Sequence, residues 1–134
     1  MKIQRILLLI SFSVILQAQS NQITLLGTWV FQSMTTITEA QREEITIVYK
    51  DQNNVETLSF NESGSIGYNV MNDGIEKNGA GIWYAEDEYI TLIVDSDTTY
   101  GTYEFQDNEL IIITSELESE EYYGYSTILK YIKE

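Results

Sequence analysis

The side chains that could do chemistry in this 134-residue sequence are mainly acids and aromatics. The chain has 21 acidic residues and ten tyrosines, but no histidine and no cysteine. Without histidine, serine and threonine hydroxyls lack their usual general base, and a metal site lacks its commonest ligand. We therefore expect a protein that is not an enzyme and that carries no cofactor.

Carboxylates remain as candidate calcium ligands or as a glycosidase-type acid pair. The densest groups are Asp95 with Asp97 and the run from Glu116 to Glu121. Neither has the glycine and the distal glutamate of a calcium loop, and no spacing selects two carboxylates for hydrolysis. We interpret them as solvated turns and predict neither a catalytic nor a metal site.

The aromatic side chains indicate a different kind of site, a ligand-lined cavity. Such pockets are mostly apolar, with a few polar groups that orient the ligand, and tyrosine hydroxyls could provide these groups. If strand alternation turns them inward, the same side chains would fill a solid core equally well. The five predicted ligand-binding residues are Tyr68, Trp83, Tyr103, Phe105 and Tyr125.

A second aromatic group, Tyr122-Tyr123-Gly124-Tyr125, gathers three tyrosines near one expected strand end. Tyrosine offers a large rigid contact area with a polar tip, so an exposed rim of this kind could bind a glycan or a protein partner. Cross-strand packing is the simpler interpretation of alternate tyrosines.

Short strands separated by polar turns must position these residues. Apolar alternation recurs every 8 to 15 residues or so, which is typical of a sandwich or barrel. Residues 35–42 and 72–79 are expected to be loops, the first with at most one helical turn. Between 45 and 50 the alternation predicts a half-buried strand, unless that segment merges with its neighbour. The candidate strands are 26–34, 45–50, 55–60, 65–71, 80–85, 89–94, 98–105, 110–114 and 122–132.

The turns between these strands are short, so each strand is expected to pair with the next. The clearest turn is Asn61-Glu62-Ser63-Gly64, where the glycine supplies a positive φ. A meander of twisted strands has two exposed edges unless its first and last strands meet. The sequence therefore predicts an all-β fold, a single up-and-down antiparallel β-barrel of eight to nine strands.

The first twenty residues have the pattern of a secretory signal peptide. Lys2 and Arg5 precede an apolar run over residues 6–16, and Ala18-Gln19-Ser20 provides a cleavage site. We expect cleavage near Ser20, a barrel domain over 21–134, and a secreted or periplasmic protein of bacterial origin. The net charge is −14 before that cleavage, which argues against nucleic-acid and membrane partners.

Two short motifs carry a resemblance to a known family. Gly27-Thr28-Trp29 opens the first strand, and Gly81-Ile82-Trp83 precedes an apolar strand. The chain resembles the lipocalin-like (calycin) domains of exported bacterial proteins, in pattern over residues 26–132. The resemblance implies that Trp29 packs across the closed end of the barrel and that a basic side chain of the last strand covers it. The candidates are Lys130 and Lys133, although lysine lacks the planar surface of arginine.

Together these features predict a protein that binds a small hydrophobic or amphipathic molecule inside its barrel. The alternative is a non-enzymatic interaction module for a protein or glycan, with a solid barrel core. In both cases Trp29 is interpreted as a structural plug rather than a ligand contact.

Overall fold

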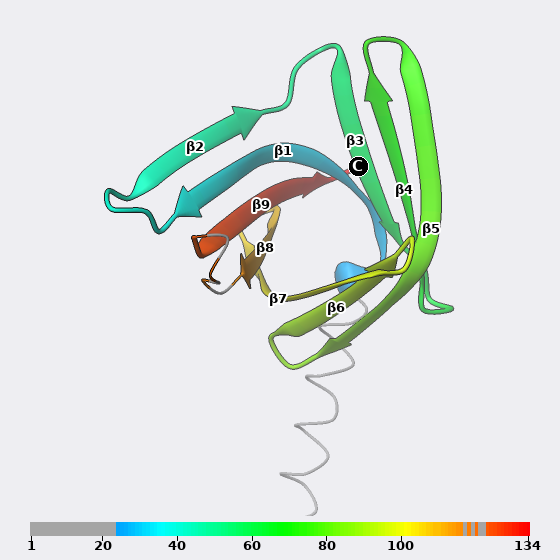
Figure 1. Ribbon diagram of the computed structural model, residues 1–134. Helices are drawn as coiled ribbons and strands as arrows, with labels where there is room; N and C mark the ends of the chain where they lie inside the picture. The colour runs from blue at the N-terminus through cyan, green and yellow to red at the C-terminus, as the bar shows by residue number, and fades with distance from the viewer. Residues whose placement is uncertain (1–23, 117, 119, 121–122) are drawn as a thin grey trace, which may run out of the picture.

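The computed structural model describes residues 24–116, 118, 120 and 123–134, so the predicted signal segment lies outside them. The described chain is all-β, with antiparallel pairing throughout (Figure 1). No helix among the described residues has the length and apolar character that crossing a membrane would require. The strands are β1 (Gly27–Thr38), β2 (Glu44–Tyr49), β3 (Asn54–Phe60), β4 (Ser65–Asn72), β5 (Ile75–Glu86), β6 (Tyr89–Val94), β7 (Asp97–Gln106), β8 (Glu109–Glu116) and β9 (Tyr125–Lys133).

Eight of these strands form a closed barrel. Each of β3 to β8 pairs with the next strand, β1 pairs with β3, and the β1–β9 pairing closes the wall. The predicted antiparallel β-barrel is confirmed. Closure protects the edges that an open sheet of this length would leave exposed.

Strand β2 departs from the predicted meander, because it pairs with β1 and not with β3. The first residues of β1, 27–30, pair with β3, whereas residues 33–38 pair with β2. The pairing of β1 with β9 shifts register between Phe31 and Ser33, which marks a bulge. A bulge bends its strand, and in Figure 1 β1 and β2 extend together to one side of the barrel.

Three sequence expectations about these segments are wrong. Residues 35–38 were expected in a loop but continue β1, since their threonines and isoleucine suit a paired strand. Residues 75–79 were also expected in a loop, yet they extend β5, whose pairing with β4 overrides the weak strand preference of Asn78 and Gly79. The half-buried strand at 45–50 is fully exposed as β2, because it lies outside the barrel.

The turns β3–β4, β5–β6 and β7–β8 lie at one end of the barrel, which we call the closed end, and the opposite end is the open end. Apolar side chains fill the closed half. Trp29 is 3% exposed, and its indole nitrogen donates a hydrogen bond of 2.9 Å to the Leu25 carbonyl oxygen. The other buried side chains there include Phe60, Ile66, Trp83, Ile90 and Leu110.

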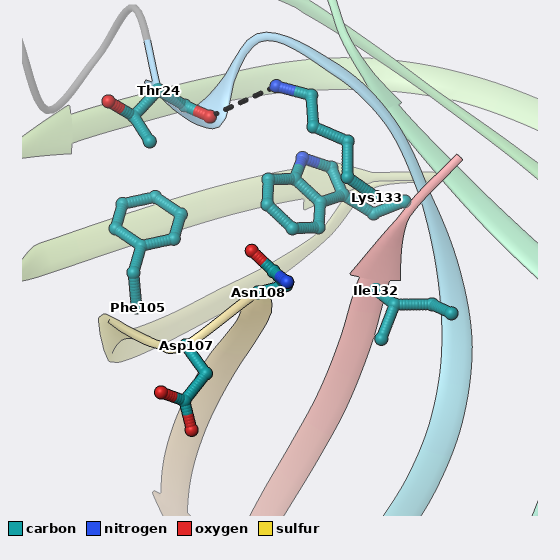
Figure 2. Close-up of a pocket in the computed structure, with 7 residues that line it drawn as sticks. Thr24, Phe105, Asp107, Asn108, Ile132 and Lys133 are labelled. Carbon is teal, nitrogen blue, oxygen red and sulfur yellow. Dashed lines mark hydrogen bonds between the residues drawn. The ribbon is translucent and has the colours of Figure 1, made fainter.

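Lys133 covers Trp29, as the resemblance implied for one of the two lysines. Its ammonium nitrogen lies 5.2 Å from the centroid of the Trp29 ring, within the range of a cation–π contact. The same nitrogen donates a hydrogen bond of 3.4 Å to the Thr24 carbonyl oxygen (Figure 2). Gly27 permits this approach, because it has a φ of +121° and an added Cβ would lie 2.9 Å from Lys133 Cε.

Candidate functional site

The two halves of the barrel interior differ in how far solvent reaches them. Inward-facing side chains of the closed half are almost completely buried, whereas apolar side chains toward the open end pack on that core and remain partly exposed. We call the second group, with Glu56, the cup. Its apolar members are Phe31, Tyr68, Leu92, Val94 and Leu129.

Glu56 places a carboxylate on the inner face of β3. It alternates along the strand with Leu58 and Phe60, which are both buried in the core. Residues two apart in a strand face the same side, so Glu56 must face the interior as they do. Its partner on β4 is Val70, so no polar side chain neighbours it in that direction.

Tyr131 of β9 meets Glu56 from the other side. The Tyr131 ring is 2% exposed, and its hydroxyl donates a hydrogen bond to the Glu56 carboxylate. Between them lies Phe31 of β1, which pairs with Tyr131 and contacts its ring edge-on at 6.0 Å. The Glu56–Tyr131 pair therefore spans β1 close to the bulge, where β1 leaves β3.

Burial raises the pKa of the Glu56 carboxyl above its ordinary value of 4.5, and the hydrogen bond from Tyr131 only partly offsets this. The pKa of Tyr131 is raised as well, first by burial and then by the nearby carboxylate, so its hydroxyl remains a donor at all ordinary pH. The next charged side chain in this row is Lys77 of β5, which pairs with Val70 and is exposed.

The raised pKa leads to a prediction about stability. Because folding favours the protonated form of Glu56, its contribution to stability is fully present below about pH 4.5 and is lost as the pH rises through the folded-state pKa. We expect Glu56→Gln to gain stability relative to the wild type between about pH 4 and pH 7. Urea unfolding across that range measures it. The matched control is Glu104→Gln on the outer face of β7, and an equal pH-dependent gain there would contradict the prediction.

Tyr68 forms a second polar contact of the cup. Its hydroxyl donates a hydrogen bond of 2.9 Å to Asp95 in the β6–β7 turn. This bond is the main cause of the raised pKa of Tyr68. To reach the turn, the ring passes over Gly79, where an added Cβ would lie 2.5 Å from Tyr68 Cε1. The missing side chain of Gly79 therefore lets the Tyr68 ring lie against β5.

A cleft opens in the barrel wall beside the cup. Strands β7 and β8 pair from Gly101 and Thr114 toward the closed end, whereas beyond them residues 98–100 pair only with β6 and residues 115–116 only with β9. The cleft between them has a volume of about 620 Å³ and is lined largely by threonines, with Tyr125 and two glutamates. Thr99 pairs with Leu92, so the cleft adjoins the cup.

The five predicted ligand-binding residues divide between the two halves. Tyr68 belongs to the cup, and Tyr125 lines the wall cleft at the open end, where it is 41% exposed. Trp83, Tyr103 and Phe105 all lie in the closed half of the barrel or on its floor. Their contact with a ligand stays a prediction. Of the predicted tyrosine rim, Tyr122 lies outside the described residues.

The closed-half aromatics are held by contacts of their own. Trp83 donates a hydrogen bond of 3.1 Å to the Asn61 carbonyl oxygen and meets Phe60 edge-on at 5.4 Å. Phe105 stacks on Trp29 at 6.0 Å and meets Tyr103 edge-on at 5.9 Å. These contacts are those of a packed core.

A shallow hollow of about 590 Å³ lies outside the closed end (Figure 2). Trp29 and Phe105 line it, with Asp107 and Asn108 from the β7–β8 turn and Lys133 from β9. Lys133 is already engaged with Trp29 and Thr24. We therefore interpret this hollow as the outer surface of the Trp29 plug and not as a ligand site.

Sequence reasoning missed the two residues that give the cup its polar centre, Glu56 and Tyr131. A signal for the first was present, since Glu56 shares a strand face with Leu58 and Phe60. Among the residues that the structure describes, no group of three or more acidic side chains is arranged to hold a metal ion.

Compared with protein-family models, with curated proteins and with solved structures, the chain shows no significant match. The features of this chain that bear on function are therefore the cup, the wall cleft and the Glu56–Tyr131 pair.

Proposed function

We propose that this protein is an exported, lipocalin-like barrel that binds a small hydrophobic or amphipathic molecule at its open end. The observation that carries the proposal is the contrast between a sealed closed half and a cup whose apolar side chains stay partly exposed. A ligand that covers them would be stabilised by about 25 cal/mol for each Å² of apolar surface removed from water.

The wall cleft supports the same proposal. Its volume of about 620 Å³ is within the range of roughly 300–1,000 Å³ that ligand pockets occupy. The cleft has hydroxyls and the aromatic rings of Tyr100 and Tyr125 next to the apolar cup, which suits a molecule with one apolar and one polar part. The plug of Trp29 under Lys133 supports the lipocalin-like part of the proposal, since the resemblance implied that contact.

Native mass spectrometry of the protein purified from its own host tests the proposal. We expect a complex heavier than the chain, which releases one small molecule on denaturation. Leu129→Trp, which adds bulk inside the cup, is expected to reduce the complex to a minor fraction. Ile47→Trp adds the same group to the outside of β2 and should leave the complex unchanged. A wild-type spectrum with only the unliganded chain, in repeated preparations, would contradict the proposal.

A second candidate function, an interaction module, is favoured by β2. Its apolar side chains face solvent, with Ile45 57%, Ile47 47% and Tyr49 68% exposed, and its outer edge has no paired strand among the described residues. Such an edge could accept an extended strand of a partner protein. One variant distinguishes the two candidate functions. Ile47→Lys would weaken strand addition but would leave the small-molecule complex intact.

A further inference from the structure

We propose that the Glu56 carboxylate, together with Tyr131, anchors the head group of the ligand and selects a small amphiphile that carries a protonated amine. This inference rests on the proposed function, since it assigns the polar contact within the same cup. It concerns the chemistry of the ligand rather than the presence of the site.

Glu56 lies in apolar surroundings within the cup. Inward-facing neighbours on both sides of its strand are apolar, with Phe31 toward β9 and Val70 on β4. A carboxylate in such surroundings loses hydration, and folding is less favourable for it than for a neutral side chain of the same shape. A polar group that weakens the fold in a barrel interior is a candidate for function.

The Glu56 carboxylate has hydrogen-bonding capacity that Tyr131 does not fill. The Tyr131 hydroxyl occupies one acceptor site of the Glu56 carboxylate. An ionised carboxylate accepts about four hydrogen bonds, so most of its capacity remains for a donor. Glu56 is only half-buried, and it lies on the face of β3 that is turned toward the cup. A protonated amine provides three donors and the opposite charge, so it suits this carboxylate better than a hydroxyl does.

The open end of the barrel is rich in carboxylates. Asp51, Asp73 and Asp95 lie in its turns, and Glu116 and Glu118 line the wall cleft, whereas these open-end segments carry only the lysines Lys50 and Lys77. A negative field of this kind attracts cations and repels anionic ligands such as fatty acids. This field favours the amine, but by itself it does not select one ligand. Glu56 provides the contact that distinguishes an amine from a neutral alcohol.

Titration calorimetry with octylamine and 1-octanol tests the inference, because the probes share a chain length and differ in head group. The measurement is made near neutral pH in about 0.15 M salt, where the Debye length of about 8 Å screens the distant charges. We expect the affinity of the wild type for the amine to exceed its affinity for the alcohol by about tenfold or more, which is the usual contribution of a hydrogen bond to a charged group.

Glu56→Gln keeps the shape of the side chain and is expected to lose this preference while it retains its affinity for octanol. Glu104→Gln removes the same charge from the outer wall and should keep the preference. Equal affinities in the wild type, or a preference that survives in Glu56→Gln, would overturn the inference and leave the proposed function standing. If neither probe binds the wild type, this inference is overturned, whereas the proposed function is decided separately by the native mass spectrum of the purified protein.

Discussion

Replacement of Trp29 by alanine is expected to lower the free energy of unfolding by about 3–5 kcal/mol. The indole is 3% exposed, stacks on Phe105 and donates a hydrogen bond to Leu25. Alanine would leave a cavity under Lys133 and an unsatisfied carbonyl oxygen at Leu25. Urea denaturation monitored by circular dichroism measures the change.

The matched control for this variant is Tyr84→Ala on the outer face of β5, where the aromatic ring is 58% exposed. Surface substitutions usually change stability by no more than about 0.5 kcal/mol. A Trp29→Ala protein as stable as the Tyr84→Ala protein would contradict the role of Trp29 as a plug. Where the Trp29→Ala protein remains folded, it is expected to bind ligand as the wild type does, since the plug lies below the cup.

The second large effect is expected for Gly81→Ala. A Cβ at Gly81 would collide with the carbonyl oxygen of Ile93, so the backbone of β5 or β6 must move. Overpacking of this kind costs about 1–3 kcal/mol. The comparison is Gly67→Ala on β4, where the nearest atom would be 3.9 Å away and the stability should be unchanged or slightly higher. If the two variants were equally stable, the expected collision of an added Cβ at Gly81 with the Ile93 carbonyl oxygen would be contradicted.

Gly81 also shows what the second glycine–spacer–tryptophan motif does. The glycine lets β6 approach closely, and Trp83 packs against Phe60 while it hydrogen-bonds to Asn61. Both motifs therefore place a tryptophan in the closed half of the barrel. The difference lies in the glycine, which admits a lysine side chain at Gly27 and a neighbouring strand at Gly81.

The sequence predicted the barrel because strand alternation and turn residues are local properties. The hairpin at residues 61–64 is an example, since the Gly64 φ of +86° and the pairing of β3 with β4 follow from the turn itself. The continuation of β1 and the placement of β2 could not be predicted in the same way. They depend on a bulge at Gln32 and on a change of partner that local alternation does not report.

The contact between Glu56 and Tyr131 was beyond prediction for a similar reason. Glu56 and Tyr131 lie far apart in sequence, and they meet only because β1 pairs with both β3 and β9. The choice of Lys133 over Lys130 depends on the same register, which places Lys133 opposite Trp29 and Lys130 opposite Ser33. Contacts that barrel closure creates require the register of every strand between them.

The contrast between the two ends of the barrel relates its stability to its proposed function. The closed end concentrates the buried aromatic contacts, whereas the open end keeps a half-buried carboxylate whose ionisation weakens the fold. We expect stabilising substitutions at Glu56 to reduce amine binding, because one side chain serves both properties.

Octylamine is expected to bind in the cup and not on the outer surface of the barrel. Nuclear Overhauser contacts between octylamine and the methyl groups of the labelled protein distinguish these two places. We expect contacts from the alkyl chain to Leu92, Val94 and Leu129 of the cup. Contacts confined to Ile45 and Ile47 of β2, with none to the cup, would contradict ligand binding inside the barrel.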